Sequence, residues 1–177
     1  MLCAMSRLIP CALLLTACQS DIDWGCDDPT SHGWDSAWEA EDLALWEATN
    51  EARALGADCP TGTYEAAAPL AFDDQLACAA RGHALNMATN DFFDHDSLDG
   101  RDPGERIDET GYAWTLWAEN ISAGRVDAET TVQGWLDSDT GHCENLLSPD
   151  ATDGGFGYAY DAESTYGHYW VQVFGRR

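Results

Sequence analysis

The change from helical to strand-like patterning along the chain constrains its fold more than any other feature. Apolar residues recur at helical spacing near 36–56 and 73–90, in a short segment after 103, and again after 127. Aromatic and β-branched runs of strand length occupy 155–161 and 169–174, with a turn between them, and an extended segment lies within 111–122. Helices segregated from a mostly antiparallel sheet predict a layered α+β fold.

Polar residues mark where the predicted helices begin. Ser36 and Glu39 have the spacing of a capping box, and so do Asp102 and Glu105. Asp127 is placed to cap the helix that follows it. The face of the first helix that we expect to be buried carries Leu45, Ala48, Thr49, Ala52 and Leu55.

The first residues form a separate unit. The apolar run 8–17 is too short to span a bilayer and has the length of a signal-peptide core. It ends in Leu15-Thr16-Ala17-Cys18, which resembles the lipobox of bacterial lipoproteins and marks Cys18 for acylation. An ordinary secretory signal cut near Ala17 is the alternative. We predict a signal peptide over 1–17, a tether over 18–35 and one domain over 36–177, exported to the cell envelope and lipid-anchored or secreted.

The cysteine count fits an exported protein. Cys3 and Cys11 leave with the signal peptide, and Cys18 is the predicted lipid acceptor. Four cysteines remain in the mature chain, and an even number of cysteines in an exported protein predicts disulfides. Four cysteines form two disulfides, for which three connectivities exist. A zinc site is the weaker interpretation, because the mature chain has no C-x-x-C spacing. The four remaining cysteines are Cys26, Cys59, Cys78 and Cys143.

The charge balance excludes some partners. The chain has 32 acidic residues against 8 basic ones, a formal net charge of -24. Such a charge repels phosphates and anionic headgroups, so we expect no nucleic-acid binding. Contact with a membrane is expected through the lipid anchor only.

Several short motifs occur in a set order. They include Asn50-Glu51-Ala52-Arg53, Phe92-Phe93-Asp94-His95, Glu105-Arg106-Ile107, Ala118-Glu119-Asn120-Ile121, Trp135-Leu136-Asp137-Ser138, Gly141-His142-Cys143-Glu144-Asn145 and Tyr169-Trp170-Val171-Gln172-Val173-Phe174. In this order and spacing the chain resembles the CAP superfamily of cysteine-rich secretory, antigen 5 and pathogenesis-related proteins, most of all its bacterial SCP-domain lipoprotein branch. The resemblance covers roughly 40–175. It implies an α-β-α sandwich with a central, mostly antiparallel sheet between helical layers.

The resemblance also implies a cleft. His95, Glu119 and His142 match the residues that line it in the family. Animal members carry a second Glu where this chain has Ser138, with Asp137 beside it, so the full tetrad is absent and these two residues are expected in the cleft instead.

Related bacterial sequences pair the residues that match Cys59 and Cys143, which leaves Cys26 and Cys78 as the second disulfide.

The expected cleft residues allow two kinds of chemistry. His95, His142 and Glu119 can ligate a divalent ion, zinc or magnesium, with one position left open. A hydrogen-bonded polar pocket without an ion is the alternative. For hydrolysis, Glu119 would be a general base, or Ser138 a nucleophile beside His142. The chain has neither a G-x-S-x-G nor an H-E-x-x-H motif, so we assign no catalytic residue.

We therefore expect a non-enzymatic binding module whose cleft takes a small hydrophobic ligand, a glycan or an envelope protein. The alternatives are a metal-dependent hydrolase of envelope peptide or glycan, and a structural or adhesive surface protein. Trp114 and Trp117 read as core, or as an aromatic lip for a lipid or glycan. His83 is expected to be a buried packing residue.

Overall fold

The computed structural model describes residues 33–177. In chain order the elements are η2 (Ser36–Trp38), α1 (Glu39–Leu55), β1 (Ala57–Cys59), β2 (Gly62–Tyr64), β3 (Ala71–Phe72), α2 (Asp74–Asn90), α3 (Pro103–Glu109), β4 (Leu116–Ala123), α4 (Ala128–Leu136), α5 (His142–Leu147), β5 (Asp153–Tyr160) and β6 (His168–Arg176). The four predicted helices, α1 to α4, and all three long strands lie where the sequence patterns predict them.

The central sheet has the strand order β3-β5-β6-β4. Strands β5 and β6 form an antiparallel hairpin, and β4 runs antiparallel to β6 from the pair Leu116–Arg176 to the pair Ala123–Tyr169. Only the short β3 is parallel to its neighbour. The prediction of a mostly antiparallel sheet is confirmed, and β4 is one edge of this sheet.

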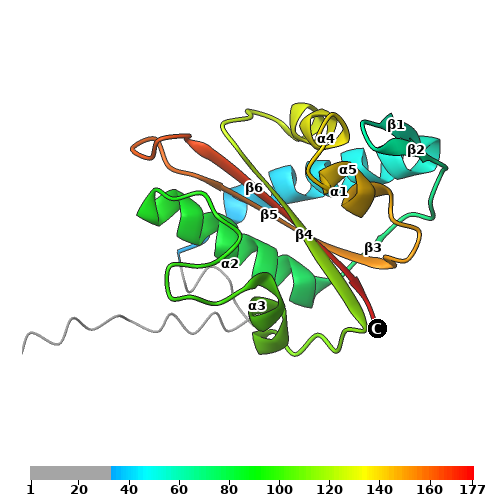
Figure 1. The fold of residues 1–177 in the computed structure, drawn as a ribbon. Coiled ribbons are helices and arrows are strands. Elements are labelled where there is room, and N and C mark those ends of the chain that lie inside the picture. The colour runs from blue at the N-terminus through cyan, green and yellow to red at the C-terminus, as the bar shows by residue number, and fades with distance from the viewer. Residues whose placement is uncertain (1–32) are drawn as a thin grey trace, which may run out of the picture.

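Helices cover both faces of the sheet, with α1, α4 and α5 on one side and α2 and α3 on the other (Figure 1). The strands alternate accordingly. Phe156 and Trp170 pack toward the first layer, while Tyr169 and Val171 pack toward the second. The predicted α-β-α sandwich is therefore confirmed.

Two glycines let α2 lie directly on β5. A Cβ atom at Gly155 would fall 2.0 Å from the backbone of Leu76, and one at Gly157 would fall 2.4 Å from the backbone of Ala80. No side chain fits between strand and helix at these positions. The close approach fixes α2, and with it the loop that follows, against the sheet.

Two predicted caps form as expected. The Asp102 side chain accepts from the Glu105 N–H, and Glu105 reciprocates at the Asp102 backbone, which is a complete capping box at α3. The Asp127 side chain accepts from the Thr130 N–H and begins α4.

The predicted capping box of Ser36 and Glu39 is wrong. Asp35, one residue earlier, supplies the capping oxygen and accepts from the Ala37 N–H, so a 3₁₀ turn precedes α1 and no side chain caps Glu39. Leu55 was expected to be buried but is 83% exposed, because it is the last residue of α1 and extends beyond the packed layer.

Short elements held by distant contacts were not predicted. The expected loop over 57–68 contains the β1-β2 hairpin, and the segment after Gly141 forms α5. The disulfide between Cys59 and Cys143 joins these two elements, as the family resemblance implied. Cys26 lies outside the described residues, so the Cys26–Cys78 pairing stays a prediction. The same holds for Cys18 and the predicted signal peptide.

The end of the predicted tether packs on the domain. Trp34 is buried, and its indole N–H donates to the Tyr158 carbonyl at 2.9 Å. The Arg81 guanidinium stacks on the Trp34 ring and binds Asp42 at 2.6 Å. Burial raises the pKa of Asp42 to about 7, even though Arg81 opposes the shift.

Candidate functional site

Glu119 of β4 is the centre of the site. Its side chain is almost completely buried, and Oε1 accepts a hydrogen bond of 2.8 Å from Nδ1 of His95. His95 lies in the loop between α2 and α3, and about half of its side chain is exposed. The predicted meeting of these two residues is therefore present at the edge strand of the sheet.

Arg106 of α3 completes this cluster and was not singled out by the sequence analysis. It donates to Oε2 of Glu119 at 2.8 Å, so both carboxylate oxygens have partners. The same guanidinium donates to the His95 carbonyl at 2.9 Å and to the Ser97 hydroxyl. One buried cation thus holds both the carboxylate and the loop that carries the histidine. No local sequence signal reveals this role, because the partners come from three separate elements.

The charges in the cluster shift its proton affinities. The hydrogen bond to Glu119 raises the pKa of His95 above its ordinary value, although partial burial opposes this. Burial alone would raise the pKa of Glu119, but the hydrogen bond from His95 and the charge of Arg106 outweigh it and hold the pKa below its usual range. Glu119 is therefore a weak base.

His142, the first residue of α5, is held by its own neighbours. Nδ1 lies 2.9 Å from the Ser138 hydroxyl, which occupies the position of the missing second Glu, and 3.4 Å from the Thr140 hydroxyl. Partial burial lowers the pKa of His142, and the positive charge of His95 adds to this effect.

Asn120 anchors the His142 segment to the sheet. Its amide donates to the His142 carbonyl at 3.0 Å and to the Gln172 side chain at 3.1 Å, and its oxygen accepts from Asn145. Gln172 in turn donates to Thr49 of α1. Adjacent residues of β4 thus hold segments on opposite faces of the sheet, because successive side chains of a strand point to opposite faces.

An open groove of about 480 Å³ runs beside His142 and Ser138. Its other lining residues include Phe93, Ile121, Arg125 and Trp135. The Ile121 carbonyl at this edge of β4 is occupied, since the Trp135 indole donates to it at 3.0 Å. This groove is the concave surface that His142 reaches.

Two sets of expected residues lie elsewhere. Asp137 is exposed and accepts from Gln133 of its own helix at 2.9 Å. Like His95 and Glu119, it is not among the residues that line this groove, so the expected common cleft stays a prediction. Trp114 stands edge-on to Trp117 and donates to Asp108, also away from the groove. Trp114 remains partly exposed, and the aromatic lip stays a prediction.

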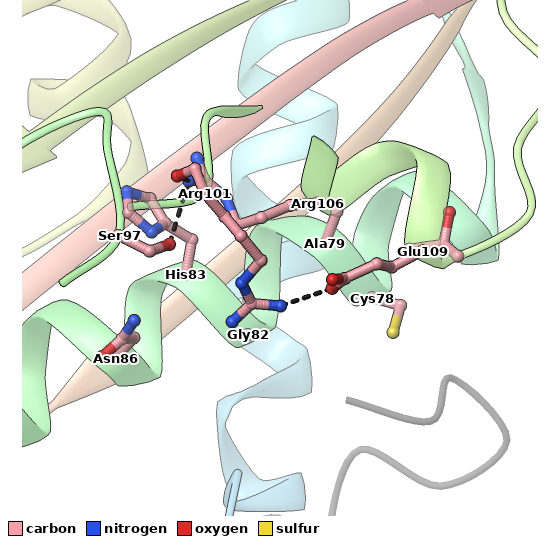
Figure 2. Close-up of a pocket in the computed structure, with 10 residues that line it drawn as sticks. Cys78, Ala79, Gly82, His83, Asn86, Ser97, Arg101, Arg106 and Glu109 are labelled. Carbon is pink, nitrogen blue, oxygen red and sulfur yellow. Dashed lines mark hydrogen bonds and ion pairs between the residues drawn. The ribbon is translucent and has the colours of Figure 1, made fainter. Parts of the chain in front are cut away.

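His83 supports the site from behind, as Figure 2 shows with Ser97 and Arg106 beside it. It is fully buried on α2, as expected, and Nε2 lies 2.9 Å from the carbonyl of Asp94, the residue before His95. Burial lowers the pKa of His83 to about 4, so the ring is neutral near pH 7. The cavity it lines has a volume of only about 10 Å³, the size of one water molecule.

The residues do not fit a metal site with His95, His142 and Glu119 as joint ligands. Residues 33–177 contain no group of three or more His, Cys, Asp or Glu side chains that could hold an ion. Both oxygens of Glu119 are engaged, and the charge of Arg106 lies against them. The hypothesis of bound zinc or magnesium therefore rests on the two imidazoles alone.

The layered fold and the cluster of His95, Arg106 and Glu119 at the edge strand together define a class of protein. The model of the cysteine-rich secretory protein family, CAP, matches residues 46–174. The chain belongs to this family.

Named relatives agree with this assignment. The uncharacterized protein YkwD of Bacillus subtilis is 34% identical over 106 residues, which cover 60% of this chain and 39% of that protein. The uncharacterized membrane protein YlbC of the same organism is 36% identical over 90 residues, 51% of this chain and 26% of that one. The chain thus spans well under half the length of these curated relatives.

Solved structures show the same fold. An extracellular SCP-domain protein of Bacillus anthracis superposes with a TM-score of 0.64 and 31% identity, over 78% of this chain and 41% of that one. An outer surface protein of Borrelia burgdorferi gives a TM-score of 0.66 at 23% identity, over 79% and 95% of the two chains. These relatives are extracellular or surface proteins. Within residues 33–177, no helix is both long and apolar enough to span a bilayer.

Proposed function

We propose that this CAP domain is a non-enzymatic binding module that takes a small ligand in the groove beside His142. The supporting observation is that the groove is open and lined by apolar and polar groups, whereas the one buried carboxylate of the site is already neutralised by Arg106 and His95. Pockets of about 300–1,000 Å³ are typical for small ligands. A groove with a few polar groups and no carboxylate in its lining suits recognition better than proton transfer.

A thermal-shift screen of envelope glycan fragments, lipids and short peptides tests this function. Binding to the native state alone raises the unfolding midpoint. We expect ligands that shift the wild type to lose most of the shift in His142→Ala and to keep it in Asp137→Asn, the neighbouring residue outside the groove. Ligands that shift the midpoint of the wild type and of His142→Ala equally would show that binding occurs elsewhere. A screen in which no ligand shifts the midpoint would contradict the proposed binding function.

Hydrolysis is the second candidate, because the Ser138 hydroxyl lies 2.9 Å from an imidazole nitrogen. In Ser–His hydrolases a carboxylate orients the other ring nitrogen. Nε2 of His142 has no carboxylate partner within residues 33–177. A fluorophosphonate probe is therefore expected not to label the protein, and labelling that Ser138→Ala abolishes would favour the hydrolase.

We also propose that the protein is exported and anchored through a lipid on Cys18. The Leu15-Thr16-Ala17-Cys18 motif supports this, as does the extracellular or surface location of its relatives. Radiolabelled palmitate should enter the wild type but not Cys18→Ala, which should appear in the soluble fraction. Metal analysis of the native protein, compared with the His95→Ala/His142→Ala double variant, tests the zinc or magnesium hypothesis.

A further inference from the structure

The composition of the groove contrasts with the rest of the chain. The chain carries 32 acidic residues, yet none of the residues that line the groove is Asp or Glu. Its ionisable lining groups are Arg125 and His142. A protein with a net charge of -24 thus has a small concave surface whose only permanent charge is positive.

Arg125 differs from the other arginines of residues 33–177. Five of them bind carboxylates, namely Arg81, Arg101, Arg106, Arg176 and Arg177. Arg53 is buried and donates to four carbonyls. The guanidinium of Arg125 makes no hydrogen bond or ion pair with the described part of the chain, although acidic residues are abundant.

This guanidinium lies beside α4. It lies against the backbone of α4 at Gly134, where a Cβ atom would fall 2.3 Å from the guanidinium carbon. The Arg125 carbonyl is held by the Trp170 indole at 2.7 Å. The charge therefore stands at the groove wall, and its donors are unused.

Exposed aromatic rings stand beside the same groove. Phe93 lines it and contacts Tyr166 at 5.9 Å between ring centres, and both side chains are nearly half exposed. Tyr166 also lies next to Gly124, another lining residue. Flat rings that remain open to solvent offer an apolar face to a ring-shaped ligand.

We propose that the groove binds an acidic saccharide, whose carboxylate or phosphate pairs with Arg125 while its ring lies on Phe93. This inference rests on the proposed binding function and names the ligand class. The planar fork of Arg matches carboxylate and phosphate oxygens, and such charge-assisted bonds are among the strongest polar contacts. The net charge of -24 disfavours extended anionic partners such as a membrane, but a small acidic ligand meets mainly the positive charge of Arg125 in the groove.

Calorimetric titration of the full-length protein with three sugars of one ring type tests the proposal. N-acetylglucosamine is neutral, N-acetylmuramic acid carries a carboxylate, and N-acetylglucosamine 6-phosphate carries a phosphate. We expect at least one acidic sugar to bind roughly tenfold more tightly than the neutral one, the gain typical of a charge-assisted hydrogen bond. The two acidic arms distinguish the carboxylate from the phosphate source.

Three variants locate the effect. Arg125→Gln should reduce the affinity for the acidic sugar to that for the neutral one, and Gly134→Ala should weaken it by displacing the guanidinium. Arg176→Gln removes the same charge from an exposed ion pair at the far end of β6 and should change nothing.

Equal binding of neutral and acidic sugars, retention of the preference in Arg125→Gln, or no binding by any of the three would overturn the proposal. If neutral ligands still bind in a His142-dependent way, the binding module stands and only the acidic ligand class fails.

Discussion

Arg106 and Glu119 form a buried ion pair of 2.8 Å that also holds the loop of His95. Removing one partner leaves an uncompensated buried charge, which typically costs about 3–5 kcal/mol. We expect Arg106→Met to lower the free energy of unfolding by that amount in urea titrations. The same substitution at Arg176, whose pair with Asp150 is exposed, should cost less than about 1 kcal/mol. Equal losses of unfolding free energy at the two positions would show that the buried ion pair stabilises the fold no more than the exposed one.

The contact between α2 and β5 leaves no room for a side chain at Gly155. Because an added methyl group meets helix backbone there, the layers must separate. We expect Gly155→Ala to cost at least about 3 kcal/mol, or to prevent folding. Gly154→Ala is the matched control, since its methyl group would meet only the side chains of Phe156 and Leu70 at 3.0–3.1 Å. We expect it to cost about 1 kcal/mol. Circular dichroism melts of both variants measure the difference, and similar midpoints would contradict the packing argument.

His83 makes folding sensitive to acid. Its folded pKa of about 4 lies below the ordinary value of 6.5, so protonation favours the unfolded chain. This contribution is fully present above pH 6.5 and is lost as the pH falls toward 4, by roughly 3 kcal/mol in total. The variant His83→Gln keeps a donor for the Asp94 carbonyl but does not titrate. We expect the stability difference between wild type and variant to shrink over this pH range, whereas a constant difference would refute the assignment.

The disulfide of Cys59 and Cys143 closes a segment with a sequence separation of 84 residues. Loop-closure entropy predicts that replacing both cysteines by Ala costs about 4 kcal/mol. Hydrogen exchange should rise most in α5 and in the β1-β2 hairpin, which the bond joins. Unchanged protection of the α5 amides from exchange would indicate that packing alone holds α5 and its first residue, His142, in place.

Much of the fold could be predicted from local sequence patterns. The caps at Asp102 and Asp127 and the periodicity of α2 and β6 were sufficient, because each depends on residues close in sequence. The helix α5 has six residues and is tied down by a disulfide, so no periodic signal could reveal it.

The site was predicted only in part, for the same physical reason. His95, Glu119 and His142 came from the family resemblance, and the structure brings Glu119 to His95 and Ser138 to His142. The roles of Arg106 and Asn120 depend on carbonyl and carboxylate partners from other elements, which spacing along the chain does not encode.

The alternation of side chains along β4 has a geometric consequence. The Glu119 side chain binds His95 in the loop between α2 and α3, on one face of the sheet. The Asn120 side chain binds the His142 carbonyl of α5, on the other face. Two adjacent residues of an edge strand therefore set the relative positions of the segments that carry the two imidazoles. A slip of β4 by a single residue would exchange these directions, separate both rings from their supports and erase the recognition surface while leaving the helices intact.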